Sequence, residues 1–195
     1  MNNLLPKQGE VYYLPGFLSA EESLGFYHRL LEEIEWLEKP IMIFGKKMMQ
    51  PRLVAWHGDK DASYKYSGLK LTPKPWTSDL LDLKQRVEES CKSSFNSVLL
   101  NLYRNETDSN GWHADDEPEL GDNPIIASLS FGETRDFLLK HKTQKDLKTK
   151  IPLENGSLLI MRGETQRFWK HCLPKRTRNL EPRINLTFRL IDPPT

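Results

Sequence analysis

The sequence predicts an α+β protein whose core is a double-stranded β-helix (jelly roll), backed by two helices from the amino-terminal half of the chain. Before residue 97, two stretches repeat apolar residues at steps of three and four, which is the period of an amphipathic helix. From residue 97 onward, apolar residues alternate in short runs between turn-forming residues, which is typical of β-strands. Two helices followed by many strands indicate a helix-backed sandwich or barrel, and a jelly roll can hold a small site at its mouth.

The first elements expected are a short strand over Glu10–Leu14 and a helix over Ala20–Trp36. Ser19 and Glu22 have the spacing of a capping box, which marks the start of this helix. Pro40 ends the helical pattern. The stripe of residues that the helix would bury consists of Leu24, Tyr27, Leu31 and Ile34.

A second helix is predicted after Thr77 or Ser78, either of which can cap its first turn. Its inner face would carry Leu80, Leu83, Val87 and Cys91. Between the two helices, residues 41–76 alternate short apolar stretches with Gly, Pro and Lys, which is the pattern of irregular hairpins.

Five strands are expected beyond the second helix, separated by turns rich in Asp, Asn, Gly and Pro. They are Ser97–Tyr103, Ile125–Phe131, Phe137–His141, Ser157–Met161 and Ile184–Ile191. Residues 97–191 are therefore predicted to form the jelly-roll core of a single domain that spans residues 1–195.

The composition is that of a soluble globular protein, with 37% hydrophobic and 28% charged residues. No apolar run reaches the length of a membrane span, and the amino terminus lacks the basic start and apolar stretch of a secretory signal. The two cysteines, Cys91 and Cys172, form no close-spaced pair, which fits a reducing compartment. We expect an intracellular, soluble monomer without membrane contact, cytoplasmic in a bacterium and nuclear in a eukaryote.

The net charge of +1 conceals an asymmetry along the chain. Residues 131–195 hold 14 Lys and Arg against 7 Asp and Glu, whereas residues 1–130 hold 14 against 20. The carboxyl-terminal third could therefore present a basic face to phosphates. A solvated, lysine-rich loop around Lys140–Lys150 would explain the same charges.

A candidate metal site consists of His113 and Asp115, two residues apart, and of His171 further along the chain. On an extended backbone, side chains at positions i and i+2 face the same way, so the first two can reach one ion. Two imidazoles and one carboxylate can bind one face of Fe(II) and leave positions open for a co-substrate and O2. Zinc is the competing metal for this ligand set. A second alternative is that the H-x-D pattern is not a metal site, because in isolation this pattern more often lies in a surface loop.

The last predicted strand favours iron with 2-oxoglutarate as co-substrate. On one face it carries Asn185, Thr187 and Arg189, in phase with Arg183 just before it. Two inward arginines imply an anion, because a buried guanidinium without a partner is costly and its fork grips a carboxylate in two places. The alternative is an outer polar face exposed to water.

Arg183 is the candidate for the distal carboxylate, and Arg189 is expected to contact the oxo-acid end or to brace Asp115. Asn101 and Tyr103 lie on one face of an earlier strand and could hydrogen-bond the same co-substrate. A buried tyrosine tied to backbone and an asparagine at a strand edge would explain these two residues equally well.

With these residues assembled, the chain resembles the AlkB family of nucleic-acid dealkylating dioxygenases from about Ile43 to Ile191. The segments that carry the resemblance are Asn101–Tyr103, Trp112–Glu117, Ile126–Gly132, Arg135–Phe137, His171–Pro174 and Arg183–Arg189. The resemblance implies iron ligation by His113, Asp115 and His171. It also implies 2-oxoglutarate contacts from Asn101, Tyr103, Arg183, Asn185 and Arg189, and a contact from Glu117 to the edge of the damaged base.

The amino-terminal half resembles the branch of that family that acts on duplex DNA. In it, residues 41–76 would form a nucleotide-recognition lid and finger. Tyr66 would stack on the extruded base with Tyr64 beside it, and Phe44 would fill the gap left by the flipped nucleotide. A core position in a hairpin is the alternative for Phe44.

The resemblance implies oxidative demethylation of 1-methyladenine and 3-methylcytosine in DNA, coupled to decarboxylation of 2-oxoglutarate to succinate, with release of formaldehyde. Fe(II) would be the cofactor, O2 and 2-oxoglutarate the co-substrates, and alkylated DNA, expected as duplex, the partner. The alternatives are an RNA or protein demethylase or hydroxylase of the same chemistry, a non-catalytic nucleic-acid-binding module, and a zinc-dependent hydrolase.

Overall fold

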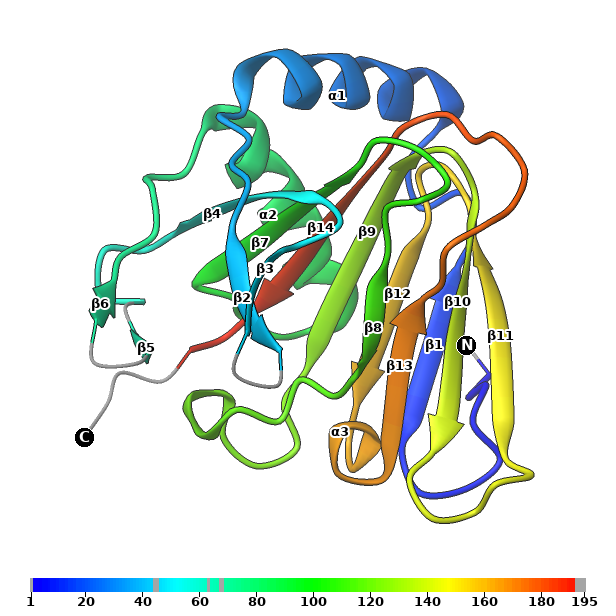
Figure 1. The fold of residues 1–195 in the computed structure, drawn as a ribbon. Helices are drawn as coiled ribbons and strands as arrows, with labels where there is room; N and C mark the ends of the chain where they lie inside the picture. Colours follow the sequence, from blue (N-terminus) through cyan, green and yellow to red (C-terminus); the bar gives the residue numbers. More distant parts are fainter. Residues whose placement is uncertain (1, 44–45, 63, 67–68, 192–195) are drawn as a thin grey trace.

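The computed structural model describes residues 2–43, 46–62, 64–66 and 69–191, with side chains described outside 41–47 and 63–71. Two antiparallel sheets face one another in a jelly-roll arrangement, as Figure 1 shows. The larger sheet has the order β1 (Glu10–Leu14), β12 (Leu158–Arg162), β9 (Ile126–Gly132), β14 (Arg183–Arg189), β7 (Ser97–Tyr103) and β4 (Leu53–Gly58). The smaller sheet has the order β11 (Lys148–Leu153), β10 (Arg135–His141), β13 (Trp169–Leu173) and β8 (Asn110–His113).

Two helices, α1 (Ala20–Glu33) and α2 (Ser78–Cys91), pack against the outer face of the larger sheet (Figure 1). The predicted capping box is present in α1. The Ser19 side chain accepts a hydrogen bond from the Glu22 backbone N–H, and the Glu22 side chain accepts one from the Ser19 backbone N–H. The α2 prediction is also confirmed: Thr77 caps the helix, and the expected inner residues Leu80, Leu83, Val87 and Cys91 are all buried.

The predicted buried stripe of α1 is confirmed for Ile34, which is buried, and for Tyr27 and Leu31, which pack against the core, but it is wrong for Leu24, and the helix is shorter than expected. Leu24 is 55% exposed, whereas Phe26 is buried with its ring centroid 6.2 Å from that of Phe131. Residues that are two positions apart in an α-helix point about 200° away from one another around the axis. Because Phe26 packs on the sheet, Leu24 faces solvent. The helix ends at Glu33, because Ile34 is already extended.

The segment 41–76 is divided between two hairpins and the larger sheet. The hairpins are β2 (Pro40–Ile43) with β3 (Lys46–Met49), and β5 (Tyr64–Tyr66) with β6 (Leu69–Leu71). Each forms a separate two-stranded sheet, while β4 between them pairs with β7 along its whole length. Residues 53–58 are therefore an edge strand of the jelly roll.

The lysine-rich stretch around Lys140–Lys150 is divided between the paired strands β10 and β11 and the exposed segment 142–146 between them, so the predicted solvated loop is present but shorter than expected. Ile151 and Leu153 of β11 are buried, and Lys148 and Lys150 alternate with them on the exposed side. The structure also adds a one-turn helix, α3 (Thr165–Phe168), and a 3-10 turn at Pro118–Leu120.

The interior between the sheets changes from apolar to polar along the strands. At one end Val11, Ile126 and Leu159 meet Leu139 and Trp169 of the smaller sheet in a closed apolar cluster. Further along β9, the inward positions become Ser128 and Ser130, and the space between the sheets opens into a cavity. In the described part of the chain, no helix has both the length and the apolar character needed to cross a membrane.

Candidate metal centre

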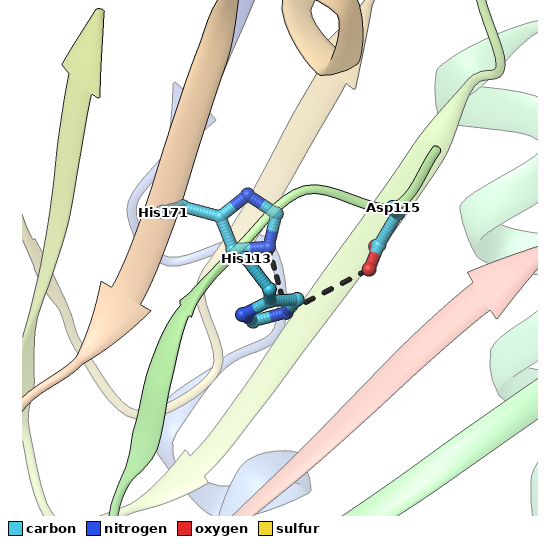
Figure 2. A group of neighbouring side chains, drawn as sticks. All are labelled: His113, Asp115 and His171. Atoms are coloured by element: carbon cyan, nitrogen blue, oxygen red, sulfur yellow. Dashed lines mark hydrogen bonds and ion pairs between the residues drawn. The ribbon is translucent and has the colours of Figure 1, made fainter. Parts of the chain in front are cut away.

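The side chains of His113, Asp115 and His171 converge between the sheets, as Figure 2 shows. Strand β8 carries His113 directly opposite His171 of β13 in the register of the smaller sheet, and the pairing shifts just beyond this point. The two Nε2 atoms are 3.1 Å apart, and His113 Nε2 is 3.7 Å from Asp115 Oδ1. One potential ligand atom from each residue lies within 4.8 Å of the others. The predicted triad is therefore assembled.

The His113 ring presents a lone pair toward the centre of this group. Its Nδ1 is 2.8 Å from the Gly111 carbonyl, which can only accept, so Nδ1 carries the proton and donates. In the neutral ring, Nε2 is then unprotonated and faces His171. Fixing the tautomer of a ligating histidine through its other nitrogen is a common arrangement in metal sites.

Asp115 is held as a carboxylate in spite of its burial. Burial alone would raise its pKa, but the charge of Arg189 and the nearby rings of His171 and His113 lower the pKa to about 2. Arg189 donates from a terminal nitrogen to Asp115 Oδ2 at 3.0 Å, which confirms the bracing contact expected for this arginine. The backbone N–H of Asp115 donates to Gln166 Oε1 at 2.9 Å.

His171 is held neutral by its surroundings. Its ring stacks on that of Phe137 with centroids 5.1 Å apart, and burial lowers the pKa of the imidazole to about 3. Two neutral imidazoles with facing nitrogens at 3.1 Å need a proton or a cation between them. Two nitrogens bound at right angles to one ion at about 2.1 Å would lie about 3 Å apart, so the observed spacing fits a shared metal ion.

A cavity of about 280 Å³ adjoins the triad and lies between the sheets. Its wall is built by β7 and β14, which pair so that Arg183 lies opposite Tyr103 and Asn185 opposite Asn101. The five predicted co-substrate contacts all line it, as does Glu117: they are Asn101, Tyr103, Arg183, Asn185 and Arg189. Alternation on these strands turns the intervening Leu100, Leu102, Ile184, Leu186 and Phe188 into the core beneath the helices.

Arg183 is a buried charge for which the described residues supply no carboxylate. It is 1% exposed, one terminal nitrogen donates to Ser130 Oγ at 2.9 Å, and its Nε lacks a hydrogen-bond partner among those residues. Burial lowers its pKa to about 10, so the guanidinium stays charged at neutral pH. An unpaired cation in a cavity is a site for an anion. The alternative of a solvent-exposed polar face is therefore wrong for this strand.

Two asparagines in the cavity are held by residues that the sequence analysis did not assign to the site. Arg52 Nε donates to Asn101 Oδ1 at 2.7 Å, and Asn185 Nδ2 donates to Ser128 Oγ at 2.7 Å. Ser128 and Ser130 have a recognisable signal in the sequence, because they alternate with apolar residues within the buried strand β9. Arg52 belongs to the segment 41–76 that is assigned only to the lid, because it precedes β4 and reaches the cavity only through the fold.

The base-recognition candidates from the segment 41–76 cannot be placed in the same way. Phe44 lies outside the described residues. Tyr64 and Tyr66 form the ends of β5, but their side chains are outside the description.

A family model described as the 2OG-Fe(II) oxygenase superfamily matches residues 10–189, and this range contains the triad, the cavity and both sheets. The chain belongs to this oxygenase superfamily. Membership favours Fe(II) over zinc for the triad and 2-oxoglutarate as the co-substrate. The facing imidazoles of His113 and His171 fit a metal ion, and the buried guanidinium without a carboxylate partner fits an anionic co-substrate.

Curated relatives of this oxygenase fall in the AlkB group. The chain is 45% identical over 188 residues to "Alpha-ketoglutarate-dependent dioxygenase alkB homolog 3" of Bos taurus, covering 92% of the chain and 65% of that relative. It is 41% identical over 177 residues to "DNA oxidative demethylase ALKBH2" of Mus musculus, covering 86% of the chain and 74% of the relative. The chain thus spans less than two thirds of the length of the first relative.

A solved structure titled "The structure of OsALKBH1" shares the fold, with a TM-score of 0.70 at 19% identity. The match covers 94% of the oxygenase described here and 97% of that chain. The overall agreement supports the jelly-roll assignment for both sheets.

Proposed function

We propose that this chain is an Fe(II)- and 2-oxoglutarate-dependent dioxygenase that removes methyl groups from N-alkylated bases in DNA. The observation that carries the proposal is the unpaired Arg183 guanidinium, which lies in the same cavity as the metal-binding triad. A hydrolytic metal site has no need of a buried cation on that wall, whereas a dicarboxylate co-substrate needs one.

His113, Asp115 and His171 would hold the metal ion on one side and leave the cavity side open. When bound, Fe(II) couples the oxidative decarboxylation of 2-oxoglutarate by O2 to hydroxylation of an N-methyl carbon, which is then lost as formaldehyde. The protein keeps each ligand in its binding form: Gly111 fixes the His113 tautomer, burial keeps His171 neutral, and Arg189 keeps Asp115 ionised.

The co-substrate would lie along β7 and β14. Arg183 would bind the distal carboxylate, because its burial and its contact with Ser130 restrict it to one orientation. Asn101, Tyr103 and Asn185 would supply further hydrogen bonds. Since Arg189 already donates to Asp115, its remaining contact with the co-substrate would be at the metal end.

The proposed substrates are 1-methyladenine and 3-methylcytosine. Methylation at these positions gives the base a positive charge and blocks its pairing edge. Less free energy is therefore needed to extrude the base from a helix. Glu117 lines the cavity and could attract the charged base. A relative named a DNA oxidative demethylase supports DNA as the substrate.

Recognition of duplex DNA would use the lid and finger within residues 41–76, with Tyr66 stacked on the extruded base, Tyr64 beside it and Phe44 in the gap. Phe44→Ala should lower turnover on a methylated duplex about tenfold and leave turnover on the matching single strand unchanged, because only the duplex has a gap to fill. An equal loss on both substrates would exclude a duplex-specific finger.

The central test measures succinate and formaldehyde released from a methylated DNA oligonucleotide. Wild-type protein should form the two in equal amounts when given Fe(II), 2-oxoglutarate and O2, and His113→Ala should form neither. Equal turnover on methylated RNA or a methylated peptide would favour the RNA or protein alternatives. Oligonucleotide binding unaffected by His113→Ala, with no succinate from wild type, would favour a non-catalytic binding module.

A second assay tests the two bound groups without turnover. Anaerobic addition of Fe(II) and 2-oxoglutarate together should produce a weak visible absorption band that neither gives alone. Arg183→Met should weaken the band at the lowest co-substrate concentration that saturates the wild type, and 10- to 100-fold more 2-oxoglutarate should restore it, because the distal carboxylate loses a hydrogen-bonding partner worth about 1.5–3 kcal/mol.

A further inference from the structure

Three lysines lie directly across from one another on the outer face of the smaller sheet. In the register of β11, β10 and β13, Lys140 is opposite Lys148 on one side and opposite Lys170 on the other. Their neighbours Leu139 and His171 are buried, so alternation places the lysines on the outside. Neighbouring strands are about 4.8 Å apart, which makes this lysine row a compact line of positive charge.

The lysine row is not balanced by acids among the described residues. Like charges directly opposite one another destabilise a sheet. Asp136, on the same strand, already contacts Arg176 and Lys150, and Asp116 contacts Lys142. No carboxylate of the described residues lies within ion-pair distance of Lys140, Lys148 or Lys170. Three neighbouring lysines without acidic partners lower the stability of the sheet, and an arrangement that costs stability in this way indicates a functional role.

An exposed aromatic ring extends the lysine row. Trp112 of β8 is 42% exposed, and Lys140 Nζ lies 4.1 Å from its ring centroid. Positive charge that can follow a backbone, combined with an aromatic face, is the combination that binds nucleic-acid strands without sequence preference. A purely electrostatic contact with a small anion would not need the ring.

The surface defined by the lysine row and Trp112 lies on the outside of the wall that holds the metal ligands. Trp112 directly precedes His113, and Lys170 directly precedes His171. Side chains alternate along β8 and β13, so Trp112 and Lys170 point outward while His113 and His171 point into the triad. A strand with one base in the cavity can therefore reach this surface with its flanking nucleotides.

We propose that Lys140, Lys148, Lys170 and Trp112 bind the phosphodiester backbone that flanks the substrate base. The proposal deepens the proposed function and rests on it for the identity of the strand. The occupant is chosen from charge complementarity: a regularly charged polyanion matches a line of lysines, and stacking on Trp112 requires bases. The predicted consequence is that affinity depends on substrate length, because a trinucleotide is too short to fill the cavity and cross this surface.

The test compares two double variants that remove the same charge. Lys148→Ala/Lys170→Ala removes the two outer lysines of the row, and Lys7→Ala/Lys92→Ala removes two exposed lysines elsewhere. Binding is measured with an unmodified 20-nucleotide single strand, without metal, across a range of salt concentrations. The row variant should bind about tenfold more weakly, with a salt slope reduced by about 1.4, because each single-strand phosphate contact contributes about 0.7. The control should keep the wild-type slope.

A single substitution separates a functional surface from a structural one. Lys148→Glu places an acid opposite Lys140 and keeps the contact between Lys140 and Trp112, so thermal stability should rise while oligonucleotide affinity falls. A fall in both would overturn the proposal, because the lysine would then be structural. Trp112→Ala should weaken binding to the oligonucleotide about tenfold and leave binding to inorganic polyphosphate unchanged, since only the former has bases to stack.

The outcomes distinguish this proposal from the proposed function. If the row variant binds and demethylates a long oligonucleotide as the control does, the surface proposal fails and the proposed function stands. If wild type releases no formaldehyde but the row variant still loses affinity, the proposed function fails and the surface remains. Tighter binding of polyglutamate than of the oligonucleotide would assign the surface to an acidic protein segment and overturn the nucleic-acid proposal.

Discussion

Gln166 holds the backbone of Asp115 in place across 51 residues of sequence, with its side-chain Oε1 accepting the Asp115 N–H at 2.9 Å in a buried environment. Lys142 extends this connection, because its ammonium donates to the Gln166 carbonyl at 2.9 Å and to Asp116 at 3.1 Å. The loop that carries the carboxylate of the triad is thus fastened to α3. Gln166 is therefore a residue that positions the backbone of Asp115 without being one of the three predicted ligands.

Gln166→Leu should lower metal affinity about 10- to 100-fold, the usual cost of losing a residue that orients a ligand. The substitution leaves the buried Asp115 N–H unpaired, which should also cost about 1–3 kcal/mol of stability. Metal affinity is measured by titration with Mn(II), and stability by urea unfolding. Gln85→Leu, on the outer side of α2, is the matched control and should change neither.

Metal binding should stabilise the protein through all three members of the triad. At a Mn(II) concentration of 100 times Kd, the gain is about 2.7 kcal/mol, or a rise in Tm of roughly 5–10 °C for a chain of this size. Asp115→Asn and His171→Ala should remove the rise, and a chelator should reverse it in wild type. Asp116→Asn, whose carboxylate contacts Lys142 instead, should retain it. A rise that persists in His171→Ala would place the ion elsewhere.

Arg183→Met should raise the KM for 2-oxoglutarate about 10- to 100-fold, because a hydrogen bond to a charged group contributes about 1.5–3 kcal/mol. Without co-substrate, the same variant should melt within about 3 °C of wild type, since it removes a buried charge that lacks an anionic partner. Thermal melts with and without 2-oxoglutarate separate the two effects. A large loss of stability without ligand would instead make Arg183 a structural residue.

His57 should make the metal-free protein less stable in mild acid. Burial lowers its pKa, against a smaller opposite effect of the hydrogen bond that Nδ1 donates to the Pro75 carbonyl at 2.7 Å. Because the unfolded chain binds the proton at a higher pH than the folded one, stability should fall as the pH drops below about 6.5. Urea unfolding between pH 7 and 5 should show a smaller slope in His57→Gln than in wild type. His28→Gln, on the exposed side of α1, should keep the wild-type slope.

The alternation of apolar residues in the strands and the capping residues of the helices allowed much of the scaffold to be predicted from the sequence. Strand β7 has the predicted limits, and β14 has the predicted faces, because a period of two fixes which side chains share a side. The start of α2 was also predictable, since its capping threonine and its apolar stripe agree. The exposure of Leu24 in α1 was not predictable, because Leu24 and Phe26 are both apolar and only the sheet beneath selects between them.

The sequence by itself determined the chemical parts: two imidazoles and a carboxylate, a strand of inward arginines, and a helix-backed β core. Only the tertiary structure decided that His113 lies opposite His171, that Gln166 holds Asp115, and that Lys140, Lys148 and Lys170 form one row. The physical reason is that local periodicity sets which face of a strand a side chain occupies. The partner across the sheet depends on strand register, which is set by packing between segments far apart in the chain.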